Sequence, residues 1–248
     1  MIQTRRRPNG ASPGSGPDRG PARQLEHLLD TRRSCRAYLP HEVPGETIRR
    51  IAAMAQRTAS WCNTQPWRLV ITRGAETERF RKAYAHAGAT AKAEPDFAFP
   101  PEYLDVYRER RRECAWQLYS SLGIERGDRA ATRRQALRNY EFFGAPHVAI
   151  VTTEEHLGVY GAIDCGAYVA NFLNAATSLG VACIAQAALA NHPSLIRGHF
   201  HLPDTRKIVC GISFGYADPE HPANAFRTHR ADIADVVTWV GFESGPAR

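Results

Sequence analysis

The stretch ASWCNTQPWRLVI, residues 59–71, contains polar side chains that could bind a ring-shaped ligand. Asn63 and Gln65 each carry a hydrogen-bond donor and an acceptor, which suits the edge of a heteroaromatic ring with alternating donors and acceptors. Pro66 restrains the backbone beside them, and Trp67 could anchor the segment in the core. The alternative is a loop whose amides bond only to nearby backbone groups, which is a common arrangement.

A second polar cluster, RRSCR at residues 32–36, could bind a phosphate group. Its guanidinium groups can form charge-assisted hydrogen bonds with phosphate oxygens, and Ser34 adds a hydroxyl. The alternative is a solvated basic turn, which is what most runs of charge are. Far along the chain, Arg227 and Arg230 form another cationic pair, and for them the alternative is again a surface location.

Composition and motifs exclude several classes of protein. The 248 residues, 43% of them hydrophobic and 23% charged, are typical of one large globular domain or two small ones. No apolar run approaches the roughly 18–20 residues of a membrane span. Neither GxGxxG, GxxxxGK[ST] nor GxSxG occurs, so nucleotide-binding loops and serine hydrolases are not supported. Because no CxxC pair occurs and His199 and His201 have no third ligand nearby, we expect no metal site.

The charge balance and the cysteines bear on partners and compartment. The net charge is +7, and only three of the 32 basic residues are lysines. They are spread along the chain rather than gathered with aromatic residues between them, so we do not expect nucleic acid as the main partner. Six scattered cysteines suit a reducing compartment, and we expect a cytoplasmic protein.

Hydrophobic periodicity predicts the elements that position these clusters. The first 21 residues, rich in Pro, Gly, Ser and Arg, are expected to form a disordered tail. Helices are expected near residues 25–30, 44–57, 76–86, 102–122, 128–143, 162–179 and 193–200. Strands are expected near residues 68–72, 147–153, 181–188, 208–216 and 235–242. The RRSCR cluster then follows the first helix, and the NTQPW segment leads into the first strand.

The order of these motifs resembles that of the FMN-dependent nitroreductase family. The cluster Arg-Arg-Ser-x-Arg, a helix, and then Ser60-x-x-Asn63-x-Gln65-Pro66-Trp67 resemble its opening. The runs GAIDCGAYVANFLNAATSLGVACIAQ and IVCGISFGYADPEHPANAFRTHRADIADVVTW resemble its central helix and its C-terminal part. The similarity spans about residues 25–242 and is greatest to the branch containing 4-nitrobenzoate reductase. Ala59, Trp61 and Cys62 depart from the commonest pattern, and Trp61 would narrow the pocket.

This resemblance implies an α+β, three-layer fold with a mostly antiparallel central sheet flanked by helices. A helical lid would be inserted at about residues 95–145 of a domain spanning residues 22–248. The resemblance also implies a homodimer in which the C-terminal segment is exchanged between subunits and two FMN molecules lie at the interface. Ser60, Asn63 and Gln65 would reach the partner's FMN, and Arg227 is the less favoured alternative to Arg230. The cofactor-binding residues would be Arg32, Arg33, Ser34, Arg36, Ser60, Asn63, Gln65, Ala185, Gln186, Ala187 and Arg230.

The implied activity is a ping-pong reaction in which NADH or NADPH reduces FMN at N5 and a nitroaromatic compound is then reduced. No catalytic side chain is required. In the lid, Arg108, Arg112, Trp116 and Tyr119 share one helical face, which suits an aromatic substrate with a carboxylate, such as nitrobenzoate. The alternative is solvated arginines beside core aromatics. A reductive dehalogenase, a flavin destructase and a non-catalytic flavin- or nucleic-acid-binding protein also remain open.

Overall fold

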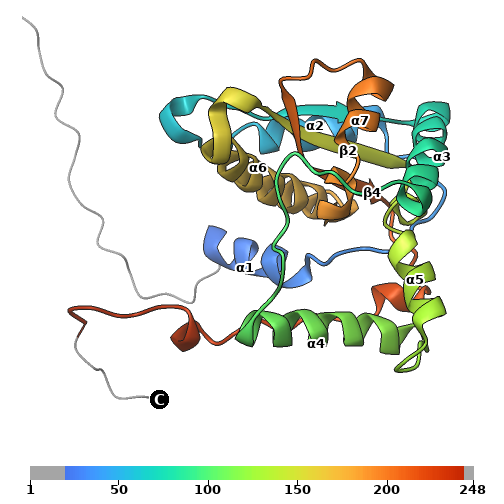
Figure 1. The fold of residues 1–248 in the computed structure, drawn as a ribbon. Helices are drawn as coiled ribbons and strands as arrows, with labels where there is room; N and C mark the ends of the chain where they lie inside the picture. The colour runs from blue at the N-terminus through green and yellow to red at the C-terminus, as the bar shows by residue number, and fades with distance from the viewer. Residues whose placement is uncertain (1–19, 243–248) are drawn as a thin grey trace, which may run out of the picture.

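The computed structural model describes residues 20–242, which form three layers with a sheet between two layers of helices (Figure 1). The strands are β1 (Arg68–Ile71), β2 (His147–Glu154), β3 (Ala182–Gln186) and β4 (Arg206–Gly215). Their order is β1-β2-β4-β3, and every neighbouring pair is antiparallel. The predicted α+β fold with an antiparallel central sheet is therefore confirmed.

The helices are α1 (Pro21–Thr31), α2 (Gly45–Ala55), α3 (Gly74–Thr90), α4 (Asp105–Ser121), α5 (Arg129–Leu137), α6 (Gly158–Ser178) and α7 (Pro193–Phe200). Helices α2 and α6 cover one hydrophobic core against the sheet, and α3 and α7 cover another. Ile51 of α2 and Phe172 of α6 belong to one core. Phe80 of α3 and Ile196 of α7 belong to the other. None of the helices in residues 20–242 is both long and apolar enough to cross a bilayer.

A bulge in β4 lets this strand serve both cores. Cys210 pairs with Val151, but the next partner, Thr152, pairs with Ile208, so Val209 is an extra residue. An extra residue reverses the side-chain alternation of a strand. Ile208 therefore packs in the core beneath α3 and α7, whereas Ile212 packs in the core beneath α2 and α6.

Within one chain, residues 235–242 form no strand, and their pairing with a partner subunit stays a prediction. A short 3-10 helix, η6 (Ile233–Asp235), is followed by irregular chain. Val236, Trp239, Val240 and Phe242 are 70%, 57%, 82% and 70% exposed. Their apolar pattern indicates burial, yet nothing in the described part of the chain covers them. We refer to residues 234–242 as the C-terminal arm.

Some predicted boundaries also differ from the structure. The helix predicted to run to Phe143 ends at Leu137, because Phe142 and Phe143 adopt positive φ and form a buried 3-10 turn. The strand predicted to run to residue 188 ends at Gln186. Of the predicted tail, residues 1–19 lie outside the described residues, and Pro21 already belongs to α1. The segment predicted to be a lid contains α4 and α5, joined to α3 by a long connection (Figure 1).

Candidate active site

The RRSCR cluster lies in an extended segment beside the edge of the sheet. Ser34 forms a parallel bridge with Cys183 of β3, and the N–H of Cys35 donates to the carbonyl of Cys183 at 3.0 Å. Cys35 and Ala37 are buried. Since side chains alternate along an extended chain, Arg32, Ser34 and Arg36 lie on the opposite side from them, where a ligand could reach them.

Asn224 connects this segment to the chain that follows β4. Its side-chain oxygen accepts the N–H of Arg36 at 2.7 Å, and its side-chain nitrogen donates to the carbonyls of Ala37 and Asp218, each at 2.9 Å. Asn224 is only 4% exposed, so these bonds are shielded from water. The connection brings Phe226 under the Arg36 guanidinium, whose carbon lies 5.3 Å from the ring centre.

Four arginines of this segment and of the chain that follows β4 have no acidic partners among the described residues. None of the ion pairs within residues 20–242 includes Arg32, Arg33, Arg36 or Arg227, which we call the arginine cluster. Burial, and then the positive charge of Arg33, lower the pKa of Arg227. Burial also lowers the pKa of Arg36. Guanidinium groups that repel one another and lack carboxylates favour binding of an anion such as phosphate.

Arg230, the arginine preferred by the sequence, makes different contacts. Its side chain donates to the hydroxyl of Thr228 at 2.9 Å and to the carbonyl of His229 at 3.0 Å. It lines a groove of about 890 Å³ between α4 and the C-terminal arm. Arg227, by contrast, donates to the carbonyl of Asn224 at 3.1 Å, and Asn224 also accepts the N–H of Arg36.

The NTQPW segment folds into a tight loop that adopts unusual backbone conformations. Cys62, Asn63 and Gln65 have φ values of 51°, 55° and 49°. Residues other than glycine in this region cost roughly 1–3 kcal/mol each and persist only where surrounding contacts hold them. Here the Ser60 hydroxyl accepts the N–H of Gln65 at 2.9 Å, and a carboxylate oxygen of Asp164 on α6 accepts the N–H of Trp61 at 3.1 Å. Ser60, Asn63 and Gln65 are therefore brought together, as predicted.

The end of β3 presents small side chains to the surface. Ala185 and Ala187 are exposed, and their size leaves the backbone accessible to a ligand. Gln186, between them, is buried, and its side chain donates to the carbonyl of Asn139 at 3.0 Å and accepts from the Ser213 hydroxyl. The Gln186 side chain thus points into the protein, where it can position β3 rather than contact a ligand.

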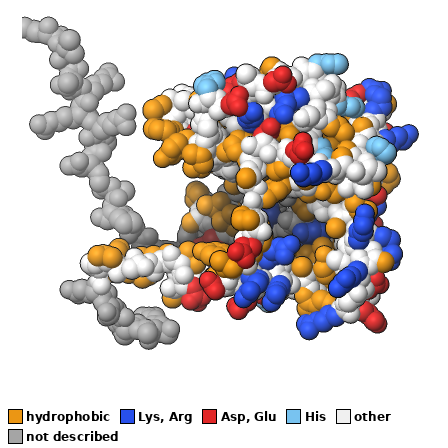
Figure 2. Space-filling model, in the orientation of Figure 1, with side chains coloured by type: hydrophobic (Ala, Val, Ile, Leu, Met, Phe, Trp, Pro, Cys, Tyr) orange, Lys and Arg blue, Asp and Glu red, His pale blue; other side chains and the backbone are white. Residues whose placement is uncertain are grey.

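The predicted substrate residues on α4 are only partly brought together. Arg112, Trp116 and Tyr119 line a cavity of about 620 Å³, and Arg108 does not. The guanidinium carbon of Arg126 lies 4.5 Å from the Trp116 ring centre and completes a cationic and aromatic wall. Figure 2 shows many basic side chains over this part of the molecule.

The two sides of α4 face different parts of the molecule. Cys114 lines the groove that contains Arg230, so its side of the helix is turned toward the chain that follows β4. Positions two apart on a helix differ by about 200°, so Trp116 points to the other side. The cavity lined by Trp116 and the groove that contains Arg230 consequently lie on opposite sides of α4.

Comparison with known proteins identifies the fold and its family. The sequence model of the Nitroreductase family matches residues 29–216. The chain belongs to the nitroreductase family. The "Nitroreductase NfnB" of Mycolicibacterium smegmatis is 33% identical to it, over 89% of this chain and 94% of that protein. The "4-nitrobenzoate reductase" of Pseudomonas putida is 31% identical, over 88% and 96%.

Solved structures of nitroreductases agree with this assignment. A crystal structure of the FMN-dependent nitroreductase NfnB from Mycobacterium smegmatis in complex with NADPH has a TM-score of 0.84 and 33% identity. The alignment covers 88% of this chain and 99% of that one. The structure of an FMN- and NADPH-dependent nitroreductase NfnB from sphigopyxis sp. strain HMH also has a TM-score of 0.84, at 29% identity. The predicted family and fold are confirmed.

The residues of this nitroreductase fit FMN, which combines a phosphate with a heteroaromatic ring. The arginine cluster offers positive charge that no acidic side chain of residues 20–242 neutralises through an ion pair. The loop at Ser60–Gln65 offers a hydroxyl and amides, and Ala185 and Ala187 offer open backbone. The chemistry of this donor set matches both ends of the cofactor.

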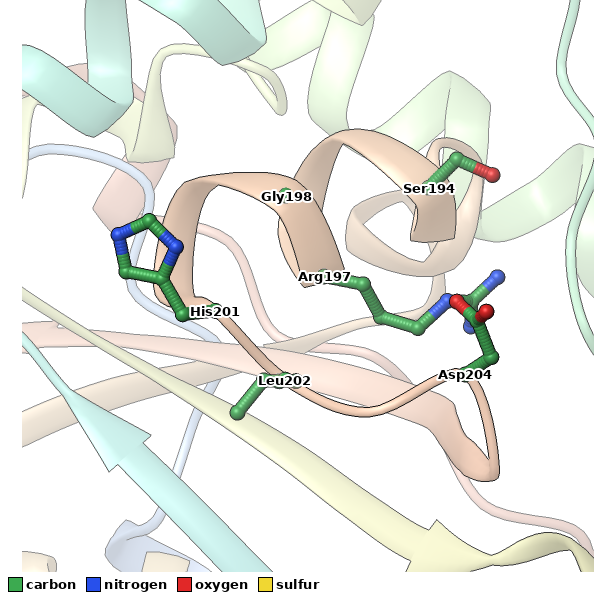
Figure 3. Close-up of a pocket in the computed structure, with 6 residues that line it drawn as sticks. All are labelled: Ser194, Arg197, Gly198, His201, Leu202 and Asp204. Carbon is green, nitrogen blue, oxygen red and sulfur yellow. The ribbon is translucent and has the colours of Figure 1, made fainter.

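A separate cavity of about 460 Å³ lies beside α7 and contains none of the predicted site residues. Arg197 and Asp204 point toward each other at its edge (Figure 3). Arg197 also forms an ion pair of 2.7 Å with Asp96, which is nearly buried. These contacts connect the segment before α4 to α7 and indicate a structural role.

Several residues that shape the site carry no signal in the sequence. Asn224 contacts Arg36 across 188 positions, and Asn139 contacts Gln186 across 47. Arg126 follows α4 in a loop without periodicity. Gln56 bonds to Gln65 from the end of α2. Only pairs of positions that vary together among relatives could have pointed to such contacts.

Proposed function

We propose that this protein is an FMN-dependent oxidoreductase that uses NADH or NADPH to reduce nitroaromatic compounds. The observation that carries the proposal is the unpaired arginine cluster beside the open end of β3, in a chain of the nitroreductase family. The names of the relatives support the same chemistry, because they include FMN- and NADPH-dependent nitroreductases and 4-nitrobenzoate reductases.

Each group of residues has its own task in this proposal. When bound, FMN supplies hydride acceptance from NAD(P)H and electron delivery to the nitro group. Arg32, Arg33, Ser34, Arg36 and Arg227 bind its phosphate. The loop at residues 60–65 orients the ring, and the end of β3 contacts the ring through backbone groups. No side chain is required to move a proton at the reacting atoms.

We further propose that the enzyme is a homodimer. One exposed apolar face combines Val159, Tyr160 and Ile163 of α6 with Trp61, whose ring centre lies 4.5 Å from that of Tyr160. Contiguous exposed apolar surface of this kind marks interaction sites, and a homodimer covers it with the same surface of a second copy. In the dimer, the loop at residues 60–65 would reach the partner's FMN. The six free cysteines suit a reducing compartment, and we propose that the enzyme acts in the cytoplasm.

The direct test is spectroscopic. The purified protein should be yellow, and denaturation should release FMN. Without oxygen, NADH or NADPH should bleach the protein, and 4-nitrobenzoate should restore the colour. A colourless protein that takes up no added FMN would refute the proposal. A bleached protein that a haloaromatic compound reoxidises, and that no nitroaromatic compound does, would favour a reductive dehalogenase instead.

The cavity on α4 predicts a preference for negatively charged substrates. Arg112 and Arg126 flank Trp116 and could bind the carboxylate of a stacked ring. We expect a higher kcat/KM for 4-nitrobenzoate than for nitrobenzene. Arg112→Gln should reduce this ratio about two- to fivefold, as expected for a partly solvated ion pair. Arg108→Gln is the matched control, because Arg108 does not line the cavity and its replacement should leave the ratio unchanged. Equal kcat/KM values for both substrates in the unmodified enzyme would show that the cavity does not bind the carboxylate of the substrate.

A further inference from the structure

A chain of hydrogen bonds runs from the core to the tip of the loop at residues 60–65. The indole N–H of Trp67 donates to the side-chain oxygen of Gln56 at 2.9 Å. The side-chain nitrogen of Gln56 donates to the side-chain oxygen of Gln65, also at 2.9 Å. The side-chain nitrogen of Gln65 donates to both the side-chain oxygen and the carbonyl of Asn63, each at 3.2 Å. We call Trp67, Gln56, Gln65 and Asn63 the amide relay.

Trp67 sets the direction of every bond in this relay. An indole N–H can only donate, so Gln56 must present its oxygen to Trp67. The nitrogen of Gln56 then faces Gln65, which must present its oxygen in turn, and the same reasoning places the nitrogen of Gln65 against Asn63. If any one of these amides were flipped, two donors or two acceptors would face each other and the hydrogen bond between them would be lost. Because Trp67 is only 3% exposed, the start of the relay is held firmly by the core.

The relay determines what the loop offers to a ligand. The side-chain oxygen of Asn63 is turned toward Gln65, so its NH₂ group is left free to donate outward. The hydroxyl oxygen of Ser60 already accepts the N–H of Gln65, so its hydrogen is also free to donate. The side-chain nitrogen of Gln65 makes both of its hydrogen bonds to Asn63. The loop thus presents donors, which suit the acceptor atoms of a heteroaromatic ring.

We propose that the amide relay presets Asn63 as a hydrogen-bond donor to an acceptor atom of the FMN ring. In this arrangement Gln56 and Gln65 are positioning residues that act through Asn63, and the Gln65 amide makes no contact with the ring. This inference rests on the proposed function, because it takes FMN as the ligand. A donor that is already oriented loses less conformational entropy on binding than a freely rotating amide.

The direction of the bond can be tested with Asn63→Asp. The aspartate keeps an oxygen for Gln65 but replaces the outward donor by a negatively charged acceptor. Titration of the apoprotein with FMN, followed by flavin fluorescence, should give a Kd at least about tenfold weaker than that of the unmodified protein, as for a lost hydrogen bond plus repulsion. The midpoint potential of the bound flavin should fall, because the electron-rich reduced ring loses a donor. Equal or tighter binding would show that Asn63 accepts from the ring and would overturn the proposal.

The positioning role of Gln56 can be tested with a double-mutant cycle. Gln56→Met keeps the length of the side chain but ends the relay, and it should weaken FMN binding about fivefold, for a bond contributing about 1 kcal/mol. In an Asn63→Ala background the same change should have no further effect, because the residue through which Gln56 acts is gone. Gln24→Met, at an exposed glutamine on α1, is the matched control and should bind FMN normally. An equal loss in both backgrounds, or no loss in either, would overturn the positioning role.

One measurement on the apoprotein separates this inference from the proposed function. By NMR, Gln56→Met should shift the Trp67 indole N–H resonance and, through the relay, the side-chain amide resonances of Asn63. An unchanged Asn63 amide would overturn the relay even if the protein binds FMN. Shifted resonances in a protein that takes up no FMN would refute the proposed cofactor while leaving the relay in place.

Discussion

Removal of the C-terminal arm, by truncation before Ala234, should give a monomer that no longer retains FMN. Val236, Trp239, Val240 and Phe242 are mostly exposed in one chain, and a partner subunit would bury them. Burial of each such side chain contributes about 1.5–3 kcal/mol, so the four together would dominate the stability of a dimer. Because the loop at residues 60–65 is proposed to serve the partner's FMN, a monomer would also lack half of each site.

Gel filtration with light scattering would report the mass of the truncated protein, and the ratio of flavin to protein absorbance would report its FMN content. A chain truncated after Phe242 is the matched control, because it keeps every apolar residue of the arm and should remain a yellow dimer. A monomer without the arm that retains FMN would contradict both the exchanged arm and the shared site.

The arm also shows what the sequence could and could not predict. Its apolar residues predict a segment that another surface covers. The sequence alone does not say whether that surface is the chain's own sheet, and it was only the family resemblance that implied a partner subunit. Within one chain the segment forms no strand and stays exposed. By contrast, α6 and β2 are correct to within about four residues, because their patterns are long and are satisfied by one chain.

The candidate site, like the arm, has features that the sequence predicts and others that it does not. The residue types of RRSCR and NTQPW could be interpreted from local spacing, and the structure places each group together. The contacts that position these residues could not be predicted, because the hydrogen bonds of Asn224, Gln56 and Asn139 join positions that are 188, 9 and 47 residues apart in the sequence. Gln186 illustrates the difference, since its place beside the site was predicted but its buried side chain was not. Hydrogen bonds between distant segments depend on the whole fold, and a single sequence does not record them.

Replacement of a residue of the arginine cluster should affect ligand binding far more than stability. Arg227→Gln removes one proposed phosphate contact, and a hydrogen bond to a charged group contributes about 1.5–3 kcal/mol, so the Kd for FMN should weaken about ten- to hundredfold. Arg32→Ala should weaken it by a similar factor. In the apoprotein, however, the nearby positive charge of Arg33 opposes the bonds that Arg227 donates to the carbonyls of Asn224 and Phe226. Arg227→Gln should therefore change the thermal midpoint of the apoprotein little.

The variant Arg230→Gln tests which of the two candidate arginines, Arg227 or Arg230, binds the phosphate of FMN. Arg230 lines the groove beside α4, whereas Arg227 donates to the carbonyl of Asn224, the residue that accepts the N–H of Arg36. The loss of Arg230 should therefore change the Kd for FMN much less than the loss of Arg227. FMN titrations of the two apoproteins at low and high salt would measure this, since phosphate contacts weaken as salt screens them. A larger loss in Arg230→Gln would mean that the chain following β4 rearranges when FMN binds. A normal Kd in both Arg227→Gln and Arg32→Ala would mean that the cluster is a solvated basic turn, and that the phosphate binds elsewhere.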